Sequence, residues 1–290
     1  MKPIFRTILT SAAAAVLLCF SAIPSAAQNA RITTTSGYRI IENGVNVTAD
    51  GWNYDGVVYK VNNTAYVGLR EFSCFADNSV VSWNEDALTA TVTTDSLTVT
   101  AVENARSMEA NGRILWCEFG IFRIDDALYV PLRQIAQAFG FDADYVSAEN
   151  RTYLTRRRGA IVSGDDYYDT EELHWLARII HAESQGEPFT GKLAVGNVIL
   201  NRVDDPGFPD TIYGVIFDKR NGTQFTPTAN GTIYNTPGEE SVMAAKICLE
   251  DTRLSEEILY FLNRRIASSM WIVENCRFVM EIGGHSFYAP

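Results

Sequence analysis

A glutamate on an otherwise apolar helix face is the first feature of this sequence that could perform chemistry. Leu173, Leu176 and Ile180 recur at positions 0, 3 and 7, which is one face of a helix, and position 10 of the same face is Glu183. Burial disfavours the ionised form of a carboxyl group and raises its pKa. A carboxyl held in this way keeps its proton near neutral pH and can act as a general acid. The pattern alone also fits a glutamate that is paired or exposed at the end of a helix.

A second carboxyl, Glu187, follows four residues later and could complete a two-carboxylate glycoside hydrolase. Gly186 and Pro188 interrupt the helix between the two glutamates, so the sequence spacing does not fix their separation. We expect Glu187 to have a structural or substrate-positioning role.

Two helices joined by a sharp corner must position Glu183. The first begins at Asp169, which forms a capping box with Glu172, and it ends at Gly186. The second is a largely apolar helix over residues 193–200, which the Asp-Asp-Pro-Gly sequence at 204–207 ends. Further along the chain we expect helices at 210–217 and 239–249, a long loop at 221–238 and a short strand at 259–262, with residues 278–288 closing the domain.

The order of motifs in this half resembles a known family. The sequence ARIIHAESQGEPFTGKLAVGNVILNRVDDPGFPDTIYGVIF is followed by QFTP, YFLN and GGHSFY. Over about residues 169–288 this order is similar to that of the SleB/CwlJ family of bacterial cell-wall hydrolases, of the spore-cortex-lytic type. The resemblance implies a mainly helical, lysozyme-like domain at 166–290 that acts on peptidoglycan glycan strands.

The resemblance also assigns roles to residues. It implies that Glu183 is the catalytic acid for the bond between N-acetylmuramic acid and N-acetylglucosamine. It further implies that one glutamate suffices, because the muramoyl C6 hydroxyl attacks the anomeric carbon and leaves a 1,6-anhydro product, as in a lytic transglycosylase. Candidates for the glycan groove, besides Glu187, are Gln224, Phe225, Phe261, Asn263 and His285.

The first half of the chain, residues 31–157, is rich in predicted strands. Residues 89–101 alternate on both sides of Asp95-Ser96, which is typical of a hairpin. The sequence at 65–70 returns in similar form at 128–133, which suggests a duplicated α+β unit with a shared core. These repeats resemble the copper amine oxidase N-terminal-like stalk domain. We expect no copper chemistry and no cofactor, because all three histidines lie in the other half of the chain.

Other kinds of chemistry find less support. His174 and His181 are seven residues apart, which is not the spacing of a zinc-binding HExxH motif. A peptidase or amidase with a cysteine nucleophile would need an activated thiolate, whereas Cys248 lies inside a predicted helix. A non-catalytic wall-binding protein is a third alternative. The cysteines could form two disulfides, Cys74–Cys117 and Cys248–Cys276, or all four could be free thiols.

Residues 1–27 have the pattern of a secretory signal peptide. Lys2 and Arg6 precede an apolar run at 8–20, and small residues at 25–27 offer a cleavage site. No later segment is apolar over the roughly 18 residues that a membrane span needs. Removal of the two basic residues changes the net charge from −11 to −13. We therefore expect a secreted, cell-wall-associated protein that binds a neutral glycan and not nucleic acid, with wall association through the N-terminal domain.

Overall fold

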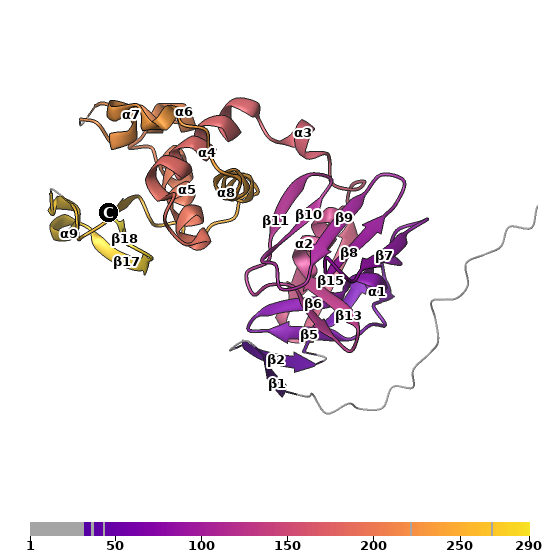
Figure 1. Cartoon of the computed structure of the whole chain (residues 1–290). Helices are drawn as coiled ribbons and strands as arrows, with labels where there is room; N and C mark the ends of the chain where they lie inside the picture. The colour runs from indigo at the N-terminus through magenta and orange to yellow at the C-terminus, as the bar shows by residue number, and fades with distance from the viewer. Residues whose placement is uncertain (1–31, 36–37, 43, 221, 268) are drawn as a thin grey trace, which may run out of the picture.

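Among the described residues, a β-rich part and a helical part each have one large hydrophobic core, of which the second includes Trp116 from the first half of the sequence, and a smaller cluster surrounds Tyr66. The computed structural model describes residues 32–35, 38–42, 44–220, 222–267 and 269–290. The predicted signal peptide lies outside these residues. Figure 1 places the β-rich part, coloured indigo to magenta, beside a mainly helical part, coloured red to yellow. Among the described residues, no helix is both long and apolar enough to cross a membrane.

Most of the β-rich part is built from three sheets. Its strands are β1 (Ile32–Thr35), β2 (Tyr38–Glu42), β3 (Asn46–Ala49), β4 (Trp52–Asn53), β5 (Val58–Val61), β6 (Thr64–Gly68), β7 (Val80–Asn84), β8 (Thr89–Thr93), β9 (Thr98–Val102), β10 (Ser107–Ala110), β11 (Arg113–Trp116), β12 (Phe122–Ile124), β13 (Ala127–Pro131), β14 (Phe141–Val146) and β15 (Arg151–Arg156). Its helices are α1 (Leu69–Ser73), α2 (Leu132–Ala138) and the 3-10 turn η1 (Ser147–Glu149). Within the described residues, the sheet orders are β1-β2-β5-β6-β13-β12, β11-β10-β9-β8-β7 and β14-β15-β3-β4.

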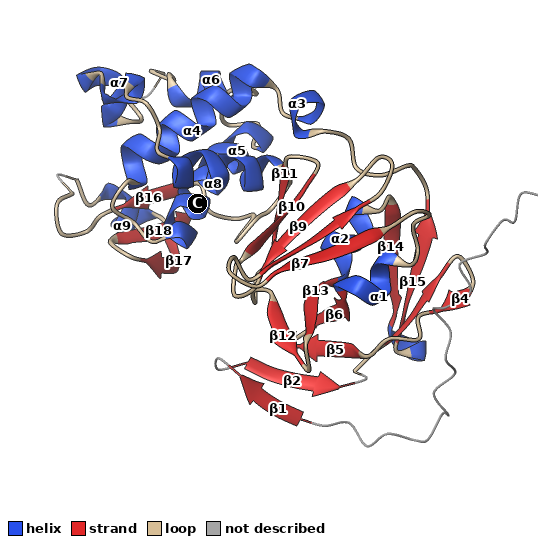
Figure 2. Cartoon of the chain, turned by 45° about the vertical axis from the view of Figure 1, so that its right-hand side comes forward, coloured by secondary structure: helices blue, strands red, loops and turns tan. Residues whose placement is uncertain are grey.

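The two copies of the sequence repeat lie next to each other in one sheet. Strands β6 and β13 pair antiparallel, with Val67 opposite Val130. Each strand leads directly into a short helix, α1 or α2, and both helices pack into the core between the sheets (Figure 2). The predicted hairpin is present as β8 and β9, with Thr93 opposite Thr98. The prediction that both copies belong to one folded unit is therefore confirmed, whereas their origin by duplication stays a prediction.

The helical part is packed around one central helix. Its elements are α3 (Gly164–Tyr167), α4 (Thr170–Ser184), α5 (Phe189–Asp204), α6 (Ile212–Ile216), α7 (Thr226–Asn230), η2 (Thr232–Tyr234), α8 (Glu239–Leu249), β16 (Tyr260–Leu262), α9 (Trp271–Asn275), β17 (Arg277–Ile282) and β18 (His285–Ala289). The two long helices, the corner between them and α8 agree with the sequence predictions. The predicted loop at 221–238 instead contains α7 and η2, and α3 and α9 were not predicted.

Helix α5 is buried along most of its length between α4 and α8. A Cβ atom at Gly196 would lie 2.7 Å from Cys248 Sγ and 2.9 Å from Ile180 Cδ1. Glycine at this position therefore allows α4 and α8 to approach α5 closely. The strands β16, β18 and β17 form a small antiparallel sheet in that order beside these helices.

Buried polar side chains on α5 fix the segment that leads into β16. Asn197 accepts a hydrogen bond from Leu254 N and donates one to Thr252 O, at 2.7 and 2.8 Å. One turn later, the Asn201 amide donates to the carbonyls of Ser255 and Ile258, both at 2.9 Å. A buried amide that lost these partners would cost about 1–3 kcal/mol. Asn197 and Asn201 therefore hold this segment against α5.

A charged and aromatic contact joins the two parts of the chain. Arg113 on β11 forms two hydrogen bonds with Glu250, just after α8, at 2.8 and 2.6 Å, and both side chains are buried. The Tyr168 hydroxyl donates to the same carboxylate at 2.7 Å. On the other side of β11, Trp116 stacks on Phe189. Both cartoon views place β11 beside α8 (Figures 1 and 2).

Candidate active site

Helix α4 carries the candidate acid, and its first turn forms as the sequence predicts. The Asp169 side chain accepts hydrogen bonds from the backbone amides of Glu171 and Glu172 at 2.9 and 3.0 Å. This N-cap satisfies amide groups that have no partner inside the helix. Leu176 and Ile180 are fully buried in the core that α4 shares with α5 and α8. The helix is therefore held along its length, which fixes the position of its last turn.

The corner after α4 is fixed by a buried lysine. Lys192 is only 4% exposed, and its ammonium group donates to the carbonyls of Gln185 and Glu187 at 3.2 and 2.6 Å. The last carbonyls of a helix lack partners within the helix and carry partial negative charge, which a cation stabilises. Lys192 therefore closes the end of α4 and sets the direction in which the chain enters α5.

Glu183 lies in that last turn and is partly buried. It makes no hydrogen bond or ion pair with the described residues that could stabilise its charged form. Burial raises the pKa of Glu183 from the ordinary 4.5 to about 7. The carboxyl group is therefore about half protonated near neutral pH, which is the state that a general acid needs.

Two cavities meet at Glu183. The larger has a volume of about 940 Å³ and is lined by residues from α4 and α5, the 205–208 turn, Asp218, residues 224–226, β16 and the segment after it, α9 and β18. The smaller has a volume of about 370 Å³ and lies between the end of α4 and the α7–η2 segment. The carboxyl group is thus reachable from two sides. A chain-like substrate could pass the acid and continue in both directions.

Five of the six predicted substrate-binding residues line the larger cavity together with Glu183. They are Gln224, Phe225, Phe261, Asn263 and His285. Three of them also contact one another, because the Phe261 ring lies 5.1 Å from that of His285 and 6.4 Å from that of Phe225. The structure therefore brings residues from three distant segments to one wall of the cavity.

Glu187 lies apart from both cavity linings and holds a turn. Its Oε2 atom accepts a hydrogen bond from the backbone amide of Gly284 at 2.8 Å. The preceding Gly283 has φ +59°, in the left-handed region that favours glycine. A Cβ atom at Gly283 would lie 1.9 Å from the Glu187 carboxylate. Glu187 thus fixes the turn between β17 and β18, immediately before His285.

His285 is 8% exposed, and its Nδ1 atom has no hydrogen-bond partner among the described residues. Burial lowers the pKa of His285, and the charge of Glu187 offsets only part of this effect. The imidazole is therefore neutral at neutral pH and can serve the cavity as a hydrogen-bonding group rather than as a cation.

Arg202 is a further residue of the larger cavity. Its Nε atom donates to Leu259 O at 2.7 Å, which holds the chain before β16, and the side chain also lines the cavity. Its guanidinium lies 4.8–5.4 Å from the rings of Phe208, Phe225 and Tyr260. Burial lowers the pKa of Arg202 to about 10, so the group still carries its charge at neutral pH. In the sequence, only the presence of Arg202 in the ILNRV motif pointed to a place in the cavity.

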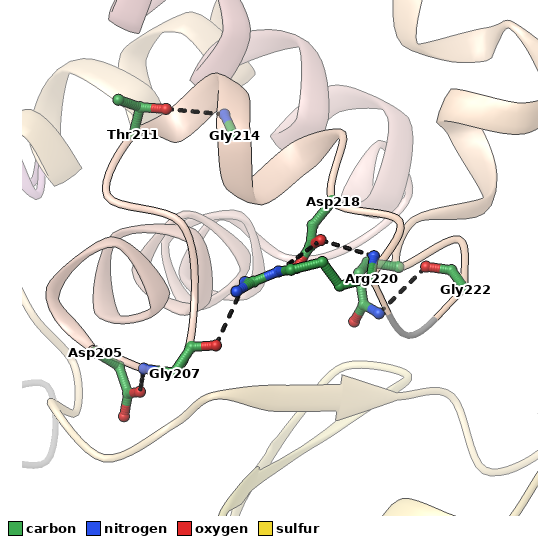
Figure 3. Close-up of polar contacts among 8 residues, drawn as sticks. Asp205, Gly207, Thr211, Gly214, Asp218, Arg220 and Gly222 are labelled. Carbon is green, nitrogen blue, oxygen red and sulfur yellow. Dashed lines mark hydrogen bonds and ion pairs between the residues drawn. The ribbon is translucent and has the colours of Figure 1, made fainter.

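The rim of the larger cavity is fixed by a cluster of short-range contacts, which Figure 3 shows. Arg220 pairs with Asp218 at 3.0 Å, and its Nη2 also donates to Gly207 O at 3.3 Å. The hydrogen bonds from Arg220 lower the pKa of Asp218, so this carboxylate stays ionised. Gln224, whose amide donates to Gly222 O at 3.4 Å, projects from the same loop. The Asp218–Arg220 pair therefore joins the two loops that form this rim.

Two exposed apolar residues that line the larger cavity, Trp271 and Ile266, were not among the candidates from the sequence. Trp271 is 55% exposed and Ile266 is 81% exposed, and both line the larger cavity. The Trp271 ring packs against that of Tyr260, with 6.3 Å between centroids. The helix that carries Trp271, α9, is only five residues long. Such a short helix leaves no periodic pattern in the sequence, so only the tryptophan itself was a signal.

The structure does not favour thiol chemistry, and it corrects the proposed disulfide. Within the part of the chain that the structure describes, Cys117, Cys248 and Cys276 are free thiols, so neither the Cys248–Cys276 nor the Cys74–Cys117 bridge forms. Cys248 points into the α5–α8 contact, where its thiol donates to Leu193 O. Burial raises the pKa of Cys248 to about 12, which removes the thiolate that a nucleophile needs. Among the described residues, no group of three or more His, Cys, Asp and Glu side chains could hold a metal ion.

The sequence matches two known families. Residues 186–288 match the cell wall hydrolase family, and residues 43–154 match the copper amine oxidase N-terminal domain. The chain is 38% identical over 120 residues to a spore cortex-lytic enzyme of Bacillus cereus, which covers 41% of this chain and 45% of the relative. It is 36% identical over 120 residues to that of Bacillus subtilis, covering 41% of this chain and 38% of the relative.

A solved structure also resembles the helical part. The catalytic domain of the germination-specific lytic transglycosylase SleB from Bacillus anthracis is 36% identical, and the match covers 44% of this chain and 99% of that domain, with a TM-score of 0.39. Through its helical part, the chain thus matches the cell wall hydrolase family and is similar in sequence to spore cortex-lytic enzymes. It spans less than half the length of those two spore cortex-lytic enzymes.

Proposed function

We propose that this protein degrades peptidoglycan by cleaving the glycosidic bond between N-acetylmuramic acid and N-acetylglucosamine, with Glu183 as the single catalytic acid and base. The observation that carries the proposal is the position of Glu183. It is an unpaired, partly buried carboxyl with a pKa of about 7, at the meeting point of two cavities. The names of the relatives support the same class of substrate.

In the proposed reaction Glu183 donates one proton and later accepts one. Glu183 first donates its proton to the glycosidic oxygen, and the bond from that oxygen to the anomeric carbon of the muramoyl residue breaks. The C6 hydroxyl of the same muramoyl residue then bonds to the anomeric carbon, and its proton passes to the Glu183 carboxylate. The products are a 1,6-anhydromuramoyl end and a free hydroxyl on N-acetylglucosamine, and no water is consumed. A single carboxyl suffices because it regains the proton that it gave.

The other residues of the larger cavity would bind and orient the glycan. Trp271 and Phe261 offer ring faces to the apolar faces of sugars. Gln224, Asn263 and neutral His285 offer hydrogen bonds to hydroxyl and acetamido groups. Glu187 would act indirectly, since it fixes the turn that carries His285.

The alternative functions have weaker support. A cysteine peptidase or amidase would need an activated thiolate, whereas the thiol of Cys248 is buried and protonated. A non-catalytic wall-binding protein would have no use for an unpaired glutamate that keeps its proton at a cavity. Since peptidoglycan lies outside the cytoplasmic membrane, the proposal also includes export through the signal peptide at residues 1–27. It further includes attachment to the wall through the N-terminal domain.

The proposal is tested by mass spectrometry of fragments released from purified peptidoglycan. The wild-type protein should release fragments that end in 1,6-anhydromuramic acid. Glu183→Gln should keep the shape of the side chain and lose at least the 10²–10⁴-fold that one general acid–base group contributes. Full activity in this variant would remove Glu183 from the mechanism. Reducing-end muramic acid as the main product would keep the acid but replace the C6 hydroxyl with water.

A further inference from the structure

A cluster of four aromatic rings, two exposed and two partly buried, lies outside the two cavity linings in the helical part. It consists of Trp175 on α4, Tyr213 on α6, Phe217 directly after α6, and Tyr234 on η2. The centroid of the Trp175 ring lies 5.3 Å from that of Tyr213, 5.2 Å from that of Phe217 and 6.3 Å from that of Tyr234. Tyr213 is 49% exposed and Tyr234 is 62% exposed. We call Trp175, Tyr213 and Tyr234 the aromatic platform, with Phe217 packed beside them.

The aromatic platform is continuous with the smaller cavity along α4. Trp175, Arg178, Ala182 and Gln185 lie at positions 0, 3, 7 and 10, which is one face of the helix. The last two of these residues line the smaller cavity. The platform and the smaller cavity therefore share one helix face, and Glu183, on the neighbouring face in the last turn of α4, also lines that cavity.

The segment that carries Tyr234 also forms part of the cavity wall. Thr232 and Asn235, on either side of Tyr234, both line the smaller cavity. Arg178 fixes this segment against α4, since its Nη1 donates to the carbonyls of Ile233 and Asn235 at 3.4 and 2.8 Å. These hydrogen bonds fix the position of Tyr234 relative to the smaller cavity.

The distance along α4 suits a polymer that extends past the acid. Eight residues separate Trp175 from Glu183, which corresponds to about 12 Å at the helical rise of 1.5 Å per residue. This distance is comparable to the length of a disaccharide unit. A strand that runs from Glu183 through the smaller cavity would reach the platform after one such unit.

We propose that the aromatic platform is a remote binding site for the glycan strand, which leaves the smaller cavity and stacks on Trp175, Tyr213 and Tyr234. This inference rests on the proposed function. Aromatic rings fit the apolar faces of sugars, and the tyrosine hydroxyls can bond to sugar hydroxyls. A stable protein partner would bury about 800 Å² on each side, far more than three side chains offer. The platform would favour long strands over short ones.

The test compares glycans of two lengths. The probes are peptide-free oligosaccharides of alternating N-acetylglucosamine and N-acetylmuramic acid, one a disaccharide and one a long strand. Binding is measured by calorimetry on the full chain with Glu183→Gln, so that nothing is cleaved. With Tyr213→Ala and Tyr234→Ala added together, the affinity for the long strand should fall about tenfold, which corresponds to about 1.4 kcal/mol.

The matched control is Tyr145→Ala. Tyr145 is a 46% exposed tyrosine on β14, in the β-rich part of the chain. It should leave the affinity for both glycans unchanged. Circular dichroism and thermal unfolding confirm that each variant folds. Equal affinity of the parent and the double variant for the long strand would overturn the proposal that the aromatic platform binds the glycan.

Two further outcomes are informative. Sedimentation that shows a dimer in the parent and a monomer in the double variant would instead assign the aromatic platform to self-association, which also overturns the inference. Failure of the proposed function gives a different result, because the wild-type protein would then release no 1,6-anhydro fragments from peptidoglycan.

Discussion

Glu183→Gln is expected to raise the free energy of unfolding above neutral pH, although it removes the proposed acid. Burial raises the pKa of Glu183 from 4.5 to about 7, so between these values the native protein keeps a proton that the unfolded chain releases. Stability therefore falls as the pH rises from about 4.5 to about 7, and then stays level. At about 1.4 kcal/mol for each pH unit, the ionised carboxylate costs at most about 3 kcal/mol. Glutamine does not ionise and avoids this cost.

Urea unfolding of the full chain at several pH values measures the effect. Wild type and Glu183→Gln should be equally stable near pH 4, where the carboxyl is protonated in both the native and the unfolded state. The variant should become more stable by up to about 3 kcal/mol near pH 8. Glu256→Gln, at an exposed position after α8, is the control for loss of a charge. A Glu183→Gln protein that gains no stability near pH 8 would refute the argument that burial holds the proton on this group.

Three further predictions follow from the charged groups. Lytic activity should fall about tenfold for each pH unit above about 7, as a pH–rate profile would record, because the protonated fraction of Glu183 falls by that factor. Glu250→Ala leaves Arg113 buried without its partner and should lower the free energy of unfolding by about 3–5 kcal/mol. The control is Glu257→Ala, which removes an exposed ion pair with Arg277 and should cost less than about 1 kcal/mol. Glu187→Ala should cost about 1.5–3 kcal/mol in the same urea assay and leave the type of product unchanged.

The sequence predicts the elements around Glu183 well because their signals are local. The Asp169 cap, the apolar stripe on α4 and the Gly-x-Pro corner each act within a few residues. The structure reproduces the helix that they predict and its end. The two-part fold, with a β-rich first part and a helical second part, was also predicted, since the strand and helix patterns lie in separate halves of the sequence.

Features that depend on contacts between residues far apart in the sequence could not be predicted from local patterns. Helix α7 and the turn η2 are too short to be stable alone, and their contacts with α4 and with each other hold them in place. The direction of the Cys248 side chain is set by the packing of α8 on α5, so two cysteines in one domain did not imply a disulfide. The cavity wall that carries Trp271 likewise exists only once β16 and α9 have packed together.

The contact between the two parts of the chain has a consequence for the proposed enzyme. Arg113 is held by two hydrogen bonds to Glu250, and its guanidinium lies 3.3 Å from the centroid of the Tyr167 ring. Charged groups buried in this manner resist separation, because each would be left without water or a partner. Glu250 directly follows α8, which packs on both α4 and α5. If the N-terminal domain attaches to the wall as proposed, it would therefore present Glu183 to the glycan in one fixed orientation, rather than on a freely moving tether.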